Sequence, residues 1–352
     1  MKKINSLTLC MTFAGCFLGA GYVSGQELWQ FFSSFGFVGY IGLVVAVALQ
    51  VVFGIILIRL AMKTGISEMD KIIIPQKNAV LQSIFAFLQE LFLFGIFVIM
   101  TAGAAALFNE VFALPEWAGS LIFCAVVALL ALKGIGAMVG VFSFFVPVLV
   151  AVTAGICIFT LSKNGLPEIT SAADGKNPLL SNWLLSAFAF VSYNIFGSIG
   201  ILTPLGDKVK NKKTVFSGVA LGGVLLFVIA LGILLVTGVF SRSINAELPM
   251  LFVAQKLNPI LGYVYAFLLF GGMLGTSLSS VVALMTYMEI KKENLKKKRF
   301  ITVPAMCLAA FVMSLVGFSD LIGFIYPVFG YLGFAALVLI IINFLKCKSC
   351  TE

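Results

Sequence analysis

The sequence predicts an all-helical protein that crosses a membrane about ten times. Of its 352 residues, 61% are hydrophobic and only 11% are charged, and this composition excludes ordinary soluble folds. The apolar residues form long runs that are separated by charged residues or by Pro, Gly and Asn, and each run is long enough to span a bilayer. We therefore treat residues 1–352 as a single transmembrane domain.

Ten runs meet this criterion, and their even number places both termini on one side of the membrane. Their approximate boundaries are 7–34, 37–62, 79–108, 116–133, 137–162, 181–205, 214–240, 258–288, 300–317 and 321–345. Cytoplasmic loops carry an excess of Lys and Arg. With the N-terminus inside, 19 of the 23 basic residues are cytoplasmic, and the four others are Lys163, Lys176, Arg242 and Lys256. Both termini and a short tail at 346–352 are thus expected in the cytoplasm.

The net charge of +9 reflects this asymmetry rather than a surface for nucleic acid. Its densest part runs from Lys291 to Arg299 and is most simply a topology anchor that also contacts anionic lipid. The bilayer is therefore an expected partner, and nucleic acid is not. Nothing in the sequence predicts an oligomeric state.

The first span is interrupted by glycines. Gly15, Gly19, Gly21 and Gly25 fall within eleven residues of an otherwise apolar segment, and glycine costs a helix interior about 1 kcal/mol relative to alanine. A broken backbone inside a membrane is tolerated only where it lines a cavity. Half-helix ends near the midplane hold an anionic group and a cation in secondary transporters, so the break predicts a binding site within the membrane.

A cleaved targeting signal is an alternative for the same segment. Lys2 and Lys3 precede an apolar run that ends at Gly15 and Cys16, which loosely resembles a secretory or lipoprotein signal. Removal of residues 1–16 would delete the first half of the interrupted span and unbalance the ten-span arrangement. We therefore expect the segment to be retained.

The sixth span carries a second interruption. Between Val191 and Gly206 it contains polar residues, several glycines and Pro204. Paired interrupted spans at the first position of each half point to a transporter built from repeats. Because each half, about 7–162 and 181–345, has five spans, the two halves have opposite topology. In the alternative interpretation, the glycines form a packing face and Pro204 ends the helix.

These motifs resemble a known family. The run Gly19-Ala20-Gly21-Tyr22-Val23-Ser24-Gly25-Gln26-Glu27, with Ser192-Tyr193-Asn194 and Pro204-Leu205-Gly206, resembles the bacterial YkvI-type membrane proteins over nearly the whole chain. That family is similar to the amino acid–polyamine–cation superfamily, which has the LeuT fold. The resemblance implies a 5+5 inverted repeat with discontinuous first and sixth helices in the bacterial cytoplasmic membrane. It also implies solute transport by alternating access, without naming the solute.

The first interruption supplies the expected substrate site. An unwound Gly19-Ala20-Gly21 frees N–H groups at the start of the outer half-helix, and these groups suit an anion. The LeuT-like pattern implies that a substrate carboxylate lies there, with its amine near freed carbonyls of the first and sixth spans. A small solute such as an amino acid or a similar zwitterion is therefore expected. The candidate residues are Phe17, Gly19, Ala20, Gly21, Tyr22, Ser192, Tyr193 and Asn194, with Phe190 and Phe196 as further apolar lining.

Hydroxyl groups in the eighth span are candidates for a coupling-ion site, because hydroxyl and carbonyl oxygens suit a hard cation. The resemblance implies sodium, held by a pair of these hydroxyls and the backbone of Gly15 and Leu18. Proton-coupled relatives often place a lysine in the fifth span, and 137–162 contains none. The hydroxyls could equally bond one turn back or pack against a neighbouring helix. The candidates are Thr276, Ser277, Ser279 and Ser280. Sodium is the only metal ion that we expect, and we expect no other cofactor.

Two carboxylates complicate the preference for sodium. Glu90 lies about ten residues into the third span, about 15 Å deep at 1.5 Å per residue, and an ionisable group at that depth is functional by default. It is a candidate proton carrier, or a neutral structural brace. Glu27 lies about 20 residues along the first span, so we expect it in the outer vestibule as a gate residue.

Enzymatic activity is not expected. The chain has no histidine and no G-x-S-x-G motif, so neither a His-based triad nor a zinc-protease helix can be formed. A channel is disfavoured because no charge ring or carbonyl filter is recognisable. The alternative to a cation-coupled transporter is a permease-like membrane sensor that binds a solute without transporting it.

Overall fold

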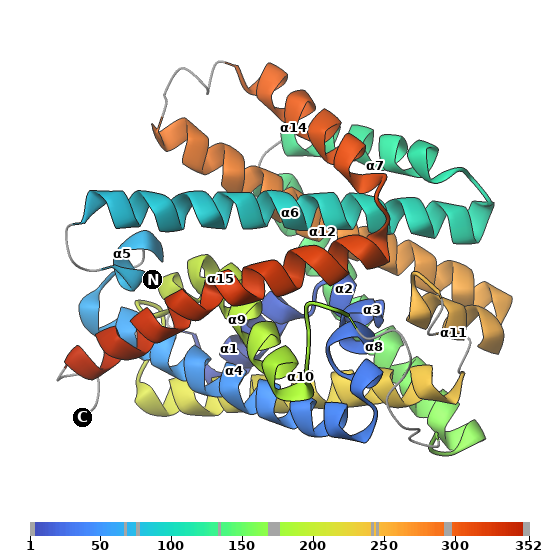
Figure 1. Cartoon of the computed structure of the whole chain (residues 1–352), viewed down its shortest axis with the longest axis horizontal. Coiled ribbons are helices and arrows are strands. Elements are labelled where there is room, and N and C mark those ends of the chain that lie inside the picture. Colours follow the sequence, from blue (N-terminus) through green and yellow to red (C-terminus); the bar gives the residue numbers. More distant parts are fainter. Residues whose placement is uncertain are drawn as a thin grey trace.

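The chain forms a bundle of long helices (Figure 1). The computed structural model describes residues 4–66, 69–74, 78–132, 135–167, 177–240, 243, 246–291 and 298–347. The long helices are α4 (Phe37–Thr64), α6 (Ala79–Phe112), α8 (Ile135–Asn164), α9 (Trp183–Leu202), α10 (Lys212–Val239), α12 (Pro259–Lys291) and α15 (Phe318–Lys346). The shorter helices are α1 (Ser6–Phe17), α2 (Ala20–Val23), α3 (Gln26–Phe31), α5 (Met69–Ile73), α7 (Glu116–Leu132), α11 (Pro249–Leu257) and α14 (Arg299–Ser314), with 3-10 turns η1 (Ser33–Phe35) and η2 (Thr203–Leu205).

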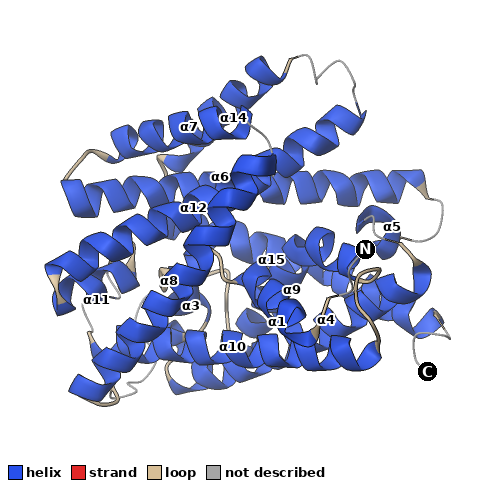
Figure 2. Cartoon of the chain, turned by 180° about the vertical axis from the view of Figure 1, so that it is seen from behind, coloured by secondary structure: helices blue, strands red, loops and turns tan. Residues whose placement is uncertain are grey.

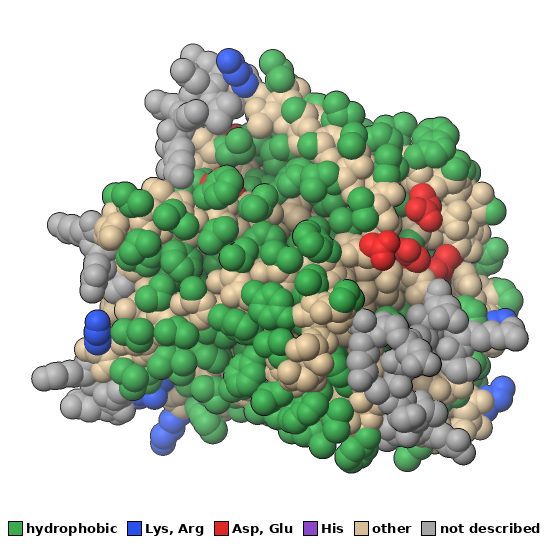
Figure 3. Space-filling view, viewed as in Figure 1, with side chains coloured by type: hydrophobic (Ala, Val, Ile, Leu, Met, Phe, Trp, Pro, Cys, Tyr) green, Lys and Arg blue, Asp and Glu red, His purple; other side chains and the backbone are tan. Residues whose placement is uncertain are grey.

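Seven helical segments of the described chain are long and apolar enough to cross a membrane. They lie in α4, α6, α8, α9, α10, α12 and α15. The remaining three predicted spans correspond to the shorter apolar helices α1, α7 and α14. In Figure 3, hydrophobic side chains cover the middle of the surface, and Lys and Arg lie near its edges. The chain is therefore a multi-pass membrane protein, as its composition predicted.

The first predicted span consists of three short helices. α1 ends at Phe17, and Leu18 and Gly19 separate it from α2. Gly25, with a φ of 87°, separates α2 from α3. Glycine adopts this left-handed conformation without the steric cost that other residues incur. The glycine-rich segment therefore leaves the helical path twice.

The sixth predicted span differs from the expectation, because α9 is continuous from Trp183 to Leu202. Gly197 stays helical, and a methyl group there would lie 2.8 Å from the ring of Phe92, so this glycine permits close packing. Pro204 lies at the start of η2, where the α-helix has already ended. The prediction of a discontinuous sixth helix is thus wrong for this structure. The packing interpretation applies to Gly197, whereas Gly200 is exposed and a methyl group there would meet no atom within 4 Å.

The interrupted first span lies at the centre of the bundle. α1 packs against α10, α2 contacts α6, α8, α10 and α12, and α3 contacts α9, α10 and α15. The view from behind shows the same central position (Figure 2). A methyl group at Gly222 of α10 would lie 2.8 Å from the ring of Phe13 in α1, so this glycine allows the two helices to approach closely.

Candidate solute-binding site

The backbone between α1 and α2 departs from helical hydrogen bonding. The N–H of Gly19 donates to the carbonyl of Phe17 at 2.8 Å, not to the carbonyl of Gly15 four residues earlier. The first backbone bond of α2 runs from the N–H of Val23 to the carbonyl of Gly19 at 3.1 Å. N–H groups in the first turn of a helix have no partner within it. The break therefore presents the N–H groups of Ala20 and Gly21, and the carbonyl of Gly15, to whatever lies beside it.

One side of the break faces open space. A methyl group added at Gly15 or at Gly19 would meet no atom within 4 Å, and both glycines are half-buried. Their neighbours Leu18 and Ala20 are only 4% and 1% exposed. The break thus has a packed side, toward the core, and an open side at the two glycines.

Glu27 is buried beside α2, close to Gly21. The turn at Gly25 directs α3 so that the Glu27 Oε2 atom lies 3.0 Å from the position that a Cβ atom of Gly21 would take. The side chain is 5% exposed. The burial of Glu27 beside Gly21 was not expected, because the prediction counted residues along a straight helix and the chain bends at Gly25. The gate role assigned to Glu27 stays a prediction.

Two tyrosines from distant segments complete this group. The hydroxyl of Tyr193 in α9 donates a hydrogen bond to the Glu27 Oε1 atom. The ring of Tyr326 in α15 stacks on that of Tyr193, with centroids 4.5 Å apart, and its hydroxyl oxygen lies 3.6 Å from the Cβ position of Gly21. Asn194 also interacts with the Glu27 carboxylate. We call Glu27, Tyr193, Asn194 and Tyr326 the carboxylate cluster.

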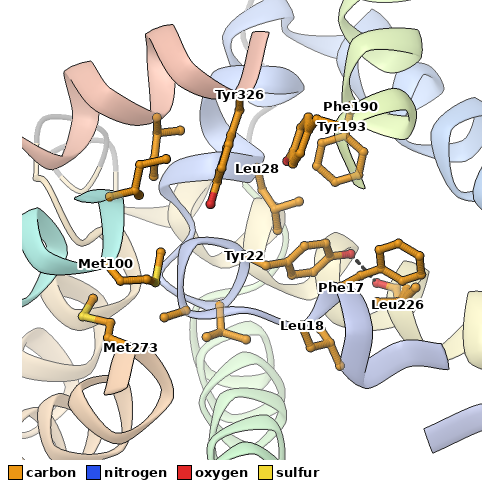
Figure 4. Packing of buried hydrophobic residues seen from close by; sticks show 14 of the residues in the cluster. Phe17, Leu18, Tyr22, Leu28, Met100, Phe190, Tyr193, Leu226, Met273 and Tyr326 are labelled. Carbon is orange, nitrogen blue, oxygen red and sulfur yellow. Dashed lines mark hydrogen bonds between the residues drawn. The ribbon is translucent and has the colours of Figure 1, made fainter. Parts of the chain in front are cut away.

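Tyr22 points away from the carboxylate cluster. Its hydroxyl donates to the carbonyl of Leu226 in α10 at 3.0 Å, next to Phe17 and Leu18 (Figure 4). Tyr22 is buried, with its ring centroid 6.3 Å from that of Phe190. Its observed contacts therefore tie α2 to α10.

Two of the three expected aromatic lining residues belong to one group of rings, because Phe190 and Phe196 are linked through Tyr193 and Phe92. Phe17 contacts Phe13 in α1, with centroids 5.0 Å apart. Phe190 packs on Phe31 and Phe32, and Phe196 packs on Phe92. All three expected lining residues are buried, but each is held by different neighbours.

The three polar residues of α9 do not share one direction. Ser192 faces α15, because a methyl group on Gly333 would lie 2.5 Å from its Oγ atom. Tyr193 faces Glu27, and the amide of Asn194 donates to the carbonyl of Phe190 at 3.0 Å. Consecutive residues of a continuous helix point about 100° apart. Ser192 therefore points in a different direction from its two neighbours, and its place in the solute site stays a prediction, whereas Tyr193 and Asn194 both interact with Glu27.

The four hydroxyl residues of α12 have different surroundings. Thr276 donates to the carbonyl of Gly272 at 3.0 Å, and Gly272 faces Ala20, whose Cβ lies 3.8 Å from the Cβ position of this glycine. The hydroxyl of Ser277 is buried without a hydrogen-bond partner in the described structure. Ser280 is buried and Ser279 half-buried. The expected sodium site, formed by hydroxyls of α12 and the backbone of Gly15 and Leu18, stays a prediction.

Glu90 lies on α6 and is half-buried. Two residues further on, Phe92 packs on Tyr193, Phe196, Tyr326 and Phe329. Because two residues of a helix differ by about 200° in direction, Glu90 projects from the face of α6 opposite to Phe92. Its role as a proton carrier stays a prediction.

A polar network that sequence reasoning missed joins α3 to α15. The amide groups of Gln26 and Gln30 donate to the side-chain and backbone oxygens of Ser319 at 2.6 and 2.7 Å. Asn177 donates to the carbonyl of Gly323 at 2.7 Å. A cavity of about 550 Å³ lies beside this network. The signal for this network in the sequence was a pair of glutamines, at positions 26 and 30, one helical turn apart.

The start of α15 is capped by an acidic side chain. The N–H of Phe318 donates to the Glu247 Oε2 atom at 3.0 Å. Burial raises the pKa of this carboxyl above its ordinary value, although the backbone N–H bonds oppose the shift. A carboxylate at a helix N-terminus is favoured by the helix dipole, so Glu247 fixes the end of α15 from which Tyr326 projects.

In sequence, the chain is similar to two proteins of Bacillus subtilis (strain 168). It is 26% identical to the uncharacterized membrane protein YkvI over 352 residues, which cover 99% of this chain and 97% of YkvI. It is 26% identical to the protein YyaD over 338 residues, covering 93% and 94% of the two chains. The predicted resemblance to YkvI-type proteins is confirmed. No protein-family model matches the chain.

In structure, the chain is similar to transporters of the LeuT fold. Mhp1 in an inward-facing conformation has a TM-score of 0.68 and 15% identity, over 96% of this chain and 76% of Mhp1. MhsT in complex with L-phenylalanine has a TM-score of 0.65 and 15% identity, over 96% and 89%. A mutant of the Eremococcus coleocola manganese transporter has a TM-score of 0.57 and 16% identity, over 97% and 78%. At these identities the similarity concerns the fold alone, and it confirms the LeuT-like architecture.

Proposed function

We propose that this protein is a secondary active transporter that moves a small solute across the bacterial cytoplasmic membrane by alternating access. The observation that carries the proposal is the interruption between α1 and α2 at the centre of the bundle. An irregular backbone within a membrane protein belongs where it lines a cavity or a binding site. The LeuT-like fold adds support, since the similar structures include transporters of chemically different cargoes.

The proposed topology has ten spans in two inverted halves, about 7–162 and 181–345. α1, α7 and α14 supply the three spans beyond the seven long helical segments. Both termini are cytoplasmic, in agreement with the distribution of Lys and Arg. Most of the proposed cytoplasmic tail, residues 348–352, lies outside the described residues.

The proposed solute is an amino acid or a similar zwitterion. Its carboxylate lies against the N–H groups of Ala20 and Gly21, which have no partner within α2. Gly15 and Gly19 provide open space beside these groups. Phe17, Tyr22, Tyr193 and Asn194 are further members of the proposed site, and Glu27 gates it.

The proposed coupling ion is sodium. Its ligands are the backbone of Gly15 and Leu18 with hydroxyls of α12, where the buried Ser277 and Ser280 lie near the half-buried Thr276 and Ser279. The carbonyl of Gly15 supports this assignment, because the bond it would accept in a regular helix is diverted to Phe17. Proton transfer through Glu90 is the alternative coupling route.

Uptake into proteoliposomes tests the proposed function. The purified full chain is reconstituted and offered a pool of labelled amino acids, with sodium and pH gradients imposed separately, and liposomes without protein serve as the control. Uptake that depends on a sodium gradient supports a sodium-coupled transporter. Saturable binding without uptake supports a membrane sensor.

A further inference from the structure

Glu27 is a buried carboxylate without a cationic partner from the protein. Its side chain is 5% exposed, and among the described residues no lysine or arginine forms an ion pair with it. Its described partners, Tyr193 at the Oε1 atom and Asn194, are both neutral. Burying an ion costs several kcal/mol unless it is paired. The site is thus electrostatically incomplete and favours a positively charged group.

The second carboxylate oxygen of Glu27 lies beside α2, so a positively charged group bound to Glu27 would lie next to that helix. The Glu27 Oε2 atom and the hydroxyl oxygen of Tyr326 lie 3.0 and 3.6 Å from one point, the position that a Cβ atom of Gly21 would take. Two acceptors from α3 and α15 therefore converge above the backbone of α2. Glycine at position 21 allows Glu27 and Tyr326 to pack directly against α2, the helix whose first N–H groups have no partner within it.

The surroundings of Glu27 suit an organic cation better than a metal ion. Hard metal cations are enclosed by oxygen ligands on several sides. Around Glu27, the rings of Tyr193 and Tyr326 are stacked, and Phe31 and Phe92 lie 5.4 and 6.3 Å from Tyr193 between ring centroids. Aromatic rings attract ammonium groups, and an ammonium group needs only a few acceptors.

We infer that Glu27, together with Tyr326, binds the ammonium group of the solute, which makes the site selective for primary amines and amine-bearing zwitterions. The inference rests on the proposed function and deepens it, because it assigns the positive end of the solute to a fixed negative charge. The negative end then lies at the N–H groups of Ala20 and Gly21. Glu27 therefore becomes a specificity-determining residue in addition to its proposed role as a gate.

Matched series of small molecules separate the two ends of the solute. The purified full chain in lipid nanodiscs, at saturating sodium, is titrated with alanine, leucine and phenylalanine. It is also titrated with the amines that lack their carboxylate (ethylamine, 3-methylbutylamine, 2-phenylethylamine) and with the acids that lack their amine (propanoate, 4-methylpentanoate, 3-phenylpropanoate). Binding is measured by calorimetry. We expect at least one amino acid and its amine to bind, and the matching acid to bind at least about tenfold more weakly.

Substitution of Glu27 then tests the residue itself. Glu27→Gln is expected to weaken binding of the amino acid and the amine by about 10- to 100-fold, because a hydrogen bond to a charged partner is lost, and to leave the weak binding of the acid unchanged. Glu116→Gln, an identical change at an exposed position of α7, should leave all affinities unchanged. Glu27→Asp keeps the charge and is expected to retain the preference for amines, which provides a test if Glu27→Gln does not fold.

Three results would overturn the inference. The first is an acid that binds the unmodified protein as tightly as its amino acid, and the second is equal affinity of Glu27→Gln and the unmodified protein for the amino acid. The third is the absence of binding by all nine compounds. Amine-selective binding without uptake into proteoliposomes would leave the ammonium assignment standing and refute the proposed transport.

Discussion

The rings of Tyr193 and Tyr326 are stacked with centroids 4.5 Å apart and planes 9° apart. This contact joins α9 to α15 directly beside the interruption of the first span. The Tyr193 hydroxyl donates to Glu27 in α3, so three segments that are remote in sequence meet at one buried carboxylate.

Removing the Tyr193 hydroxyl alone should lower the free energy of unfolding less than removing the whole ring. Tyr193→Phe keeps the stacking and leaves Glu27 one donor short, which is expected to lower the free energy of unfolding by about 1–3 kcal/mol. Tyr193→Ala also removes the ring and should cost about 3–5 kcal/mol. Chemical unfolding in detergent measures both. Equal losses would show that the ring contributes nothing beyond its hydroxyl, and no loss in Tyr193→Phe would show that the hydroxyl contributes nothing. A Tyr193→Phe/Glu27→Gln double variant should show coupling between the two sites.

A methyl group at position 21 should disturb solute binding. In Gly21→Ala the new Cβ atom lies 3.0 Å from the Glu27 Oε2 atom, and forcing a group into occupied space costs about 1–3 kcal/mol. We expect affinity for the bound amino acid to fall about tenfold or more in calorimetry. The matched control is Gly155→Ala in α8, where a methyl group meets no atom within 4 Å. Unchanged affinity in Gly21→Ala would place the solute elsewhere.

The hydroxyls of α12 should determine the response to sodium. Replacing Ser279 and Ser280 by alanine is expected to abolish the sodium dependence of uptake while solute binding persists at high concentration. Loss of these ligands lowers the affinity for sodium more than it lowers the stability of the fold. Thr286→Ala serves as the control, since its hydroxyl bonds one turn back to Val282 at 2.8 Å in the same helix.

A sodium response that survives in the double serine variant would assign those hydroxyls to packing. Glu90→Gln then becomes the informative variant. If Glu90 carries the coupled proton, this change should abolish uptake driven by a pH gradient.

The topology predicts that the two ends of α9 face opposite sides of the membrane. Single cysteines at Leu166 and at Asn211, both exposed, are introduced into a cysteine-free variant. An impermeant maleimide added to intact cells should label position 166 and should label position 211 only after permeabilisation. Labelling of both from one side would refute the inverted repeat.

The sequence predicted the interruption of the first span to within a residue or two, because glycine spacing is a local property. It also placed Tyr193 at the site, since the resemblance to a family aligned that motif. The direction of Ser192 was not predictable from composition, because it depends on whether α9 is continuous or broken. Continuity is decided by packing partners such as Phe92, which come from another part of the chain.

The burial of Glu27 beside Gly21 was not predicted for a different reason. Counting residues assumed a straight helix, whereas Gly25 adopts a φ of 87° and redirects α3. A glycine two residues before a membrane carboxylate was the available signal. Tyr326 gave no such signal, because its contact with Tyr193 depends on the packing of α15 against α9, and a single sequence does not encode that contact locally.

The most direct test of the central claim is concentrative uptake by the reconstituted full chain. Proteoliposomes with an inward sodium gradient are supplied with a labelled amino acid that binds the purified protein, and the internal concentration is followed over time. The proposed function predicts accumulation above the external concentration, loss of that accumulation when an ionophore dissipates the gradient, and its absence in Glu27→Gln. Tight binding with no accumulation under any sodium or pH gradient would contradict transport.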